Sequence, residues 1–433
     1  MPASGRRGAS LRTDRVACQV PTACRRASIE LGAGELPDNT RLNAALENLP
    51  PEIRRQILLA ADFDGLNALV HASPVFHQQY LLDRRCILYE SLKSTLGIVF
   101  VDAYTVYQSG QVDFLRTRST ESVTRILEAY KERRSSTTQA CSLSTASIIS
   151  PLARRYTTWT LDNLSKESGT QVSYEPLSKP EETRVTRALY RLQLFSNLFG
   201  ENHEHPFYPR LRFTWNDVLE ILIFLFEPWE VEELHSVYTF AKATYNQIFD
   251  EIAWDVDESN PKFDGQRPPM PDGAFDLVNS RTSLLEGTTS RGLQLLHTVL
   301  FSIRDHSHLV ETMQNNISLG ECQLEEYILH ETTQYWRQCY LGPSERDLKQ
   351  ERRDPLPFRG DRVPNPDPAG GEILYPPLAW TIIWKGNEDL KMWGYVMWDA
   401  WRLESIGARE VLKRQWATYW EEAEDPRNEG RLF

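Results

Sequence analysis

The apolar pattern of residues 228–252 constrains the fold more than any other feature of the sequence. The pattern is formed by the apolar positions Val231, Leu234, Tyr238, Ala241, Tyr245, Ile248 and Ile252. They recur at alternating steps of three and four, which places them along one stripe of an α-helix. Pro228 suits the first turn, and the acidic residues that follow it at 230, 232 and 233 favour the helix dipole. The pattern predicts a long helix that packs against a core, with a short coiled coil of about three heptads as the alternative.

Helix signals continue through most of the chain, whereas strand signals are scarce. Ser178 and Glu181 form an S-x-x-E capping signal, and Gly200 ends the apolar helical face that follows them. That face consists of Val185, Ala188, Leu189, Leu192 and Phe199. Strand-like alternation is confined to residues 373–375 and 380–384. The expected class is mainly α, with a short N-terminal three-helix module and a larger, irregular helical domain after it.

Charge, apolar runs and cysteine usage exclude several classes of function. The formal net charge of −12 opposes attraction of the whole surface to nucleic acid or anionic lipid, so neither is an expected partner. The longest apolar run, residues 221–226, is far shorter than the roughly 20 residues that cross a bilayer. The six cysteines form no C-x-x-C pair, which argues against a zinc ribbon and a disulfide scaffold. We therefore expect a protein of the cytoplasm or nucleus.

Shifts in composition divide the chain into segments. Residues 1–40 are rich in arginine and are expected to be a disordered basic tail, with mitochondrial targeting as the alternative. The stretch 135–147, rich in serine and threonine, predicts a mobile connector, and the stretches rich in proline and glycine predict loops. The remaining segments are a helical module at 41–97, a helical extension at 98–134, a connector region at 135–180, and a helical C-terminal domain at 181–433 with loops at 259–273 and 342–377.

Residues 42–90 predict three or four short helices. Pro50 and Pro51 preset a first helical turn, and Ile53 lies one turn ahead of Ile57. Asp64 follows in a turn and is expected to cap the second helix. That helix must end near residue 73, because Pro74 disfavours a helical residue before it, and Ser73 then caps the third helix.

The order of residues in this stretch resembles the F-box family. The ten positions that carry the resemblance are Leu49, Pro50, Glu52, Ile53, Ile57, Leu58, Leu66, Leu69, Ser73 and Phe76. The amino-acid sequence of residues 69–80 is similar to the corresponding stretch of F-box-like proteins of filamentous fungi. The resemblance covers roughly 50 of the 433 residues. This chain departs from the family pattern in having Pro74 where a basic residue is usual, and in lacking the tryptophan common near the end.

The resemblance implies recruitment rather than catalysis. An F-box docks on a Skp-type adaptor held by a cullin-RING ubiquitin ligase, and the rest of the chain selects a substrate. The implied adaptor-binding residues are Leu49, Pro50, Glu52, Ile53, Ile57, Leu58, Leu66, Leu69 and Phe76. Docking requires an exposed apolar patch that includes Pro50, Ile53, Ile57 or Leu58. The alternative is a scaffold whose degenerate module packs within the chain, which predicts that Ile53, Ile57 and Leu58 are fully buried.

Tryptophan is concentrated near the C-terminus, where it could bind a substrate protein or fill a core. Seven of the twelve tryptophans are Trp380, Trp384, Trp393, Trp398, Trp401, Trp416 and Trp420. Several are spaced three or four apart, and aromatic stripes of this kind mostly serve packing. Because tryptophan is enriched in binding hot spots, Trp393, Trp398 and Trp401 are the candidates for a substrate-binding surface.

The sequence nominates no catalytic residue, no metal ligand and no cofactor. It contains no G-x-G-x-x-G, P-loop, H-E-x-x-H or G-x-S-x-G motif. The histidine pairs at 203–205 and 306–308 lack a third ligand nearby, and the acidic run at 255–258 lacks the glycine and the final glutamate of a calcium loop. An enzyme would need a deep pocket lined by carboxylates or histidines, which is the third hypothesis.

Overall fold

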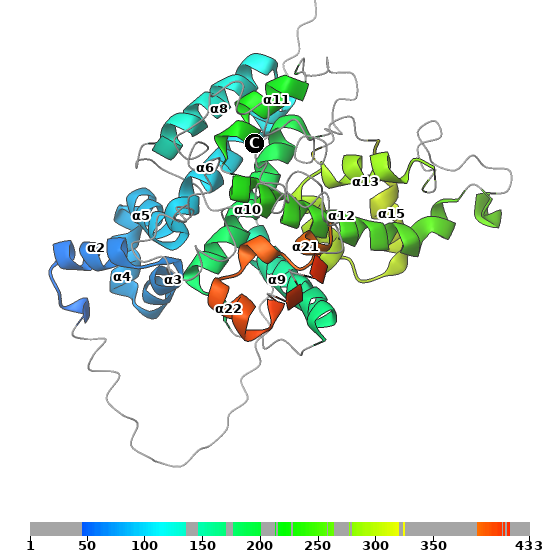
Figure 1. The fold of residues 1–433 in the computed structure, drawn as a ribbon. Coiled ribbons are helices and arrows are strands. Elements are labelled where there is room, and N and C mark those ends of the chain that lie inside the picture. Colours follow the sequence, from blue (N-terminus) through cyan, green and yellow to red (C-terminus); the bar gives the residue numbers. More distant parts are fainter. Residues whose placement is uncertain are drawn as a thin grey trace, which may run out of the picture. The chain divides into compact units, whose positions relative to one another are not determined.

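The computed structural model is helical throughout the part of the chain that it describes (Figure 1). The described residues are 46–135, 146–169, 176–200, 213, 215–226, 228–257, 259–263, 277, 279–319, 324, 388–408, 410–411 and 414–415. The prediction of a mainly α protein is confirmed for these residues. The expected tail at 1–40, the loop at 342–377 and both strand candidates lie outside them. From Pro51 onward the chain forms one compact unit.

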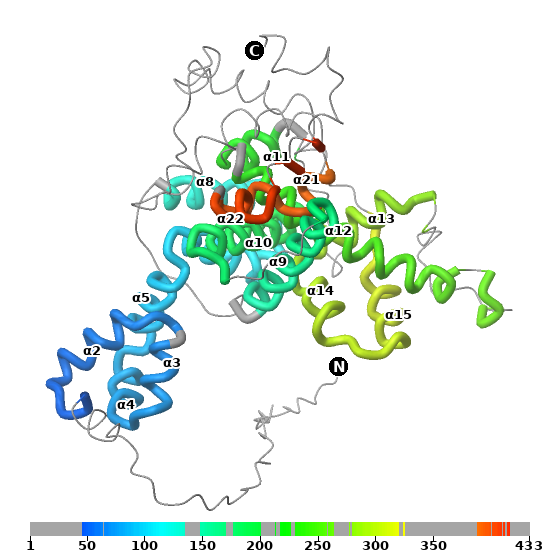
Figure 2. Tube along the Cα trace, turned by 60° about the horizontal axis from the view of Figure 1, so that its bottom comes forward, coloured from blue at the N-terminus to red at the C-terminus, as the bar shows by residue number. Residues whose placement is uncertain are grey.

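Four short helices share a small core of their own. They are α2 (Pro51–Ala60), α3 (Phe63–Ala72), α4 (Pro74–Leu82) and α5 (Arg84–Leu96). Their fully buried apolar side chains are Leu58, Leu66, Phe76 and Ile87. Figure 2 shows the four helices packed side by side, and their contacts are extensive between α2 and α5, α3 and α4, and α2 and α4. We call this group the α2–α5 module.

Capping residues set the boundaries of the module's helices. Ser73 caps α4 as predicted, because its Oγ accepts a hydrogen bond from the Phe76 N–H at 3.3 Å. The cap of α3 differs from the prediction: Asp62, not Asp64, accepts a hydrogen bond from the Gly65 N–H at 2.8 Å. A helix begun at Phe63 places position 62 at the N-cap, where a carboxylate reaches the third helical N–H.

The larger core is built from helices that follow the module. The first group is η1 (Gly97–Val99), α6 (Phe100–Ser109), α7 (Val112–Arg116), α8 (Thr120–Ser135), α9 (Ala146–Ser168) and α10 (Lys179–Phe199). The second is α11 (Trp215–Ile221), η2 (Ile223–Leu225), α12 (Pro228–Val256), η3 (Pro261–Phe263), α13 (Arg281–Thr289), α14 (Leu293–His297), the π-helical η4 (Thr298–Ser302) and α15 (His306–Gln314). The last is α21 (Glu388–Met392), η5 (Tyr395–Met397) and α22 (Ala400–Ser405).

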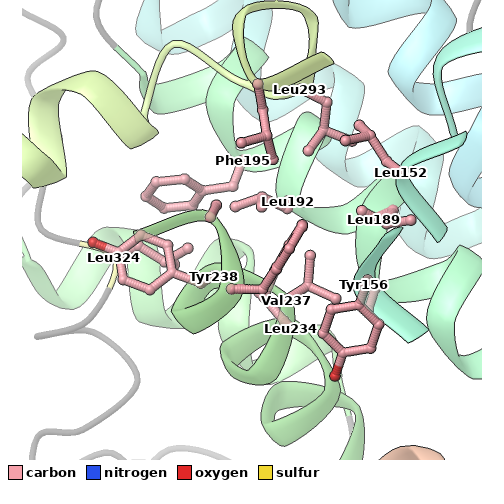
Figure 3. Close-up of a cluster of buried hydrophobic side chains, with 14 of the residues drawn as sticks. Leu152, Tyr156, Leu189, Leu192, Phe195, Leu234, Val237, Tyr238, Leu293 and Leu324 are labelled. Atoms are coloured by element: carbon pink, nitrogen blue, oxygen red, sulfur yellow. The ribbon is translucent and has the colours of Figure 1, made fainter. Parts of the chain in front are cut away.

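Helices α10 and α12 form the centre of this core. Every apolar residue of the stripe predicted for α12 is buried, so the prediction of a core helix is confirmed. Figure 3 shows Leu192 and Phe195 of α10 beside Leu234 and Tyr238 of α12, with side chains of α9 and α14 completing the cluster. The predicted capping box of α10 is also present, since Ser178 and Glu181 bond each other reciprocally.

Helix α9, Ala146–Ser168, occupies half of the region 135–180 that was expected to be a connector, so the expectation is wrong for that half. The hydroxyl side chains do not interrupt this helix, since they bond carbonyl groups one turn earlier: Thr157 Oγ1 donates to Ala153 O at 2.9 Å and Thr160 Oγ1 to Tyr156 O at 2.9 Å. Leu152 and Tyr156 lie in the same core as α10. The region 98–134, expected to be a helical extension, consists of helices whose apolar residues belong to this core, and η3 lies within the expected loop at 259–273.

The C-terminal segment, residues 388–408, completes the core over α9, α10 and α12. Arg184 of α10 donates to the carbonyl of Met397 at 3.1 Å and to Asp399 Oδ1 at 2.9 Å. Arg402 reaches Glu181 with two bonds of 2.8 Å. Asn163 of α9 donates to the Met392 carbonyl at 2.9 Å. Polar groups on α9 and α10 thus fix the position of this segment.

Candidate functional site

The outward face of α2 is the first candidate for a partner-binding surface. Ile53 is 41% exposed, and the neighbouring Glu52 is exposed as well. Ile57, one turn later, is half-buried and packs against the core of the α2–α5 module. Before the helix, Pro50 is exposed and Leu49 is half-buried. An exposed β-branched residue on a helix face is available to a partner without any rearrangement.

Several of the implied adaptor-binding residues are instead core residues. Leu58 is completely buried, Leu66 is 3% exposed and Phe76 is 1% exposed. Leu69 is half-buried against the same cluster. The expectation that Leu58 belongs to an exposed patch is therefore wrong, because α2 turns this residue towards α3, α4 and α5. Leu58, Leu66 and Phe76 can support a partner only by holding the helices in place.

Two exposed leucines at the end of α4 were not identified from the sequence. Leu81 is 56% exposed and Leu82 is 81% exposed. Helical periodicity, counted from the apolar Phe76, would have placed both leucines on the outer side of α4. At 100° per residue, position 82 lies about 240° around the helix from position 76, and so points away from the core.

A polar contact fixes α2 against the start of α5. Arg55 Nε bonds Asp83 Oδ2 at 2.5 Å, and its Nη2 lies 3.7 Å from the Cys86 thiol. The bond to Asp83 raises the pKa of Arg55 above its ordinary value, so this guanidinium stays charged. On α3, the Phe63 N–H donates to Thr95 Oγ1 at 2.9 Å. These contacts hold the face that contains Ile53 on a fixed scaffold.

Two of the three tryptophans expected to bind a substrate are buried. Trp393 and Trp398 have no exposed surface, and their indole N–H groups donate within the fold, to Gln415 Oε1 at 2.9 Å and to the Trp393 carbonyl at 2.8 Å. The substrate-binding expectation for these two is wrong, and their core role is confirmed. Trp401 is 40% exposed, with the Arg402 guanidinium 4.9 Å from its ring centroid. Trp401 remains a candidate.

The sequence patterns did not predict a buried network of arginines and carboxylates. Arg191 of α10 bonds Asp102 Oδ1 at 2.9 Å and Glu230 Oε1 at 2.7 Å, while Arg187 bonds Glu233 Oε2 at 2.8 Å. All five side chains are nearly inaccessible to solvent. Glu230 and Glu233 thus bind the arginines of α10, beyond any role at the helix dipole. No sequence motif indicates these ion pairs, because the arginines and carboxylates are far apart along the chain.

A second polar cluster lies where α12 meets the C-terminal segment. Glu232 and His235 are spaced as E-x-x-H on one face of α12, and both are 1% exposed or less. Glu232 Oε2 accepts a hydrogen bond from Tyr395 at 3.2 Å, and the Lys391 ammonium acts on both side chains. This positive charge opposes a bound cation. Within the described residues, no three potential ligands are grouped to hold a metal ion.

The histidine at 306 takes part in a surface bridge. Its Nε2 lies 2.8 Å from Asp255 Oδ2, and its Nδ1 lies 3.3 Å from Glu251 Oε1. These contacts join α15 to α12, and Asp255, the first residue of the acidic run, thus contributes to helix packing. The histidine pair at 203–205 lies outside the described residues.

Among the described helices, none has the length and apolar character needed to cross a membrane. No model of a protein family, no curated protein and no solved structure matches this chain.

Proposed function

We propose that this chain is a non-catalytic, F-box-like substrate receptor. Residues 41–97 dock on a Skp-type adaptor, and the rest of the chain presents a target protein to a cullin-RING ubiquitin ligase in the cytoplasm or nucleus. The exposure of Ile53 supports the proposal: an apolar side chain of the F-box pattern faces solvent on a helix held by a core of its own. Trp401 is the candidate for contact with the target.

A small apolar surface is sufficient to supply the free energy of docking on the adaptor. Complete burial of one large apolar side chain is worth about 1.5–3 kcal/mol. Ile53 is already partly covered, so its share is smaller, and Leu81 and Leu82 offer further apolar area on α4 of the same module. A few such anchors commonly dominate a protein interface, provided that the surrounding contacts exclude water.

The second candidate function is a helical scaffold whose module binds no ligase. The burial of Leu58 fits that alternative, which required Ile53, Ile57 and Leu58 to be fully buried. Ile53 and Ile57 do not meet this requirement. The exposure of Ile53 and the partial exposure of Ile57 therefore support the receptor over the scaffold.

A binding assay with purified Skp-type adaptor tests the proposal. The full-length protein is immobilised beside Ile53→Asp and Val112→Asp, where Val112 is a control residue that is 57% exposed on α7. We expect the unchanged protein and the Val112 variant to capture the adaptor, and the Ile53 variant to bind at least about tenfold more weakly. Circular dichroism at increasing temperature establishes that both variants fold.

The outcomes separate the two functions. If the unchanged protein captures no adaptor under conditions where an authentic F-box protein does, the scaffold becomes the leading function. If the Ile53 and Val112 variants bind equally well, the docking face does not include the exposed side of α2.

A further inference from the structure

One face of α12 contains three buried polar side chains, each with an atom that lacks a hydrogen-bond partner. These atoms are Glu232 Oε1, His235 Nδ1 and Ser236 Oγ. Each of the three residues is 1% exposed or less. At 100° per residue, positions 232, 235 and 236 span only about 100° of the helix surface, so their side chains are neighbours. The three polar atoms therefore belong to one small region of the protein interior.

Helix α9 and the C-terminal segment enclose this region. Tyr395 of η5 donates a hydrogen bond to the other carboxylate oxygen of Glu232, Oε2, at 3.2 Å. From α9, the fully buried Tyr156 packs its ring against that of Phe240 on α12, with centroids 5.6 Å apart. Gly394, next to Tyr395, lies so close to α9 that a Cβ on it would be 2.8 Å from Tyr156 Oη. Three elements of the fold thus separate the polar face of α12 from bulk solvent.

The hydroxyl group of Tyr156 is a fourth buried polar atom without a hydrogen-bond partner. Burial raises the pKa of Tyr156, and the hydroxyl group of Ser236 opposes this rise. The two hydroxyl groups are therefore near each other, although no hydrogen bond of normal geometry joins them. Polar groups that face each other beyond direct hydrogen-bond distance are commonly bridged by water.

The chemistry of the four atoms selects the kind of occupant that would satisfy them. A buried polar group without a partner loses its hydration and gains nothing in return, which is why folded proteins contain few of them. A metal ion would need a third histidine, cysteine or carboxylate ligand, and the described residues bring none to this region. A water molecule both donates and accepts, makes about two to four hydrogen bonds and fits an enclosed polar space.

We propose that this region is an internal water site that joins α12 to α9 and to the C-terminal segment. One or two water molecules bond Ser236 Oγ, Tyr156 Oη, His235 Nδ1 and Glu232 Oε1, since a buried water makes about three hydrogen bonds. Glu232 then bonds water through one carboxylate oxygen and Tyr395 through the other. The bound water thus extends the polar contacts of the C-terminal segment into the interior.

Urea unfolding of hydroxyl-deletion variants of the full-length protein tests whether these groups have partners. Ser236→Ala and Tyr156→Phe should each lower the folding equilibrium constant by roughly fivefold, because each removes a hydrogen bond to water. The double variant should lose clearly less than the two effects combined, since both hydroxyl groups bond the same water. Ser236→Ala with Tyr245→Phe is the control pair: the two positions are about 13 Å apart along α12, so their effects should add. Single variants that are as stable as the unchanged protein, or more stable, would overturn the proposal, because deletion of an unsatisfied hydroxyl costs nothing.

A count of bound water separates a water bridge from a direct bond between the two hydroxyl groups. Oxygen-17 magnetic relaxation dispersion counts the water molecules that stay bound for longer than the protein takes to tumble. The double variant Tyr156→Phe with Ser236→Ala should have at least one such water fewer than the unchanged protein, whereas Tyr245→Phe with Ser236→Ala should lose fewer than that double variant does. An equal count in the unchanged protein and in the double variant of Tyr156 and Ser236 would show that the region holds no water bridge, and the proposal would be wrong.

Discussion

At the scale of single residues, His306 makes a pH-dependent contact with two carboxylates of α12. Hydrogen bonds with Asp255, and then with Glu251, raise the pKa of His306 above 6.5, and the bond with His306 lowers the pKa of Asp255. The raised pKa means that the stabilisation is fully present below pH 6.5 and is lost as pH rises through the pKa of the folded protein. His306→Gln should therefore lower the melting temperature more at pH 5.5 than at pH 8.0.

Differential scanning calorimetry at the two pH values checks this prediction. An Asp255→Asn background provides the control, because His306→Gln should have a smaller effect there when its main partner is removed. An effect of His306→Gln that is equal at both pH values, or unchanged by Asp255→Asn, would contradict the assignment of the bridge.

The F-box pattern identified several important residues without separating the buried ones from the exposed ones. The F-box pattern singled out Ile53 and Leu58 together, and one faces solvent while the other is fully buried. They are five positions apart, which corresponds to about 140° around a helix. Their separation into core and surface was therefore implied by periodicity. For Trp393 and Trp401, by contrast, only the tertiary fold decides which side of α22 and its neighbours faces water.

At the scale of elements, the capping box of α10 links helix stability to the C-terminal segment. Ser178 Oγ accepts a hydrogen bond from the Glu181 N–H at 3.2 Å and also donates to Asp399. Loss of an N-cap side chain costs about 1 kcal/mol. Ser178→Ala should lower the free energy of unfolding in urea by about 1 kcal/mol or somewhat more, since the bond to Asp399 is lost as well.

Thr158→Ala in the middle of α9 is the matched control. Its hydroxyl bonds a carbonyl of the same helix, that of Arg154 at 3.1 Å, and alanine favours a helix interior. This variant should change stability little. If Ser178→Ala is no more destabilising than Thr158→Ala, the cap of α10 contributes less than the geometry indicates.

Elements with a local signal were predicted, and elements defined by distant contacts were not. The apolar stripe of α12 and the capping box of α10 each depend on residues of a single helix, so both could be predicted from the sequence. Helix α9 was missed because the connector signal of residues 135–147 was extended to residue 180, although hydroxyl groups beyond residue 147 bond within the helix. The buried ion pairs were missed because Arg187 and Glu233 are 46 positions apart.

At the scale of the whole molecule, the C-terminal segment is required to cover the core. Trp393 and Trp398 are completely buried, and Arg402 is the partner of the buried Glu181. A chain ending at residue 387 would expose apolar surface and leave Glu181 without this partner, a change that typically costs about 3–5 kcal/mol. We expect the truncated protein to unfold at a lower urea concentration and to self-associate.

Size-exclusion chromatography with light scattering, together with binding of a dye specific for exposed apolar surface, tests this expectation. Removal of residues 416–433 alone provides the comparison, because it leaves the C-terminal segment in place. A truncated protein that stays monomeric, binds no dye and unfolds at the original urea concentration would show that the segment is dispensable for the core.

The bond between Glu181 and Arg402 also bears on the synthesis of this protein. The two residues are separated by 221 positions, and ribosomes add roughly 5–20 residues per second. About 10–40 s therefore pass between the emergence of the carboxylate and that of its guanidinium partner. Throughout that interval the nascent chain has an unfinished core, so we expect its exposed apolar surface to depend on shielding by chaperones beside the ribosome.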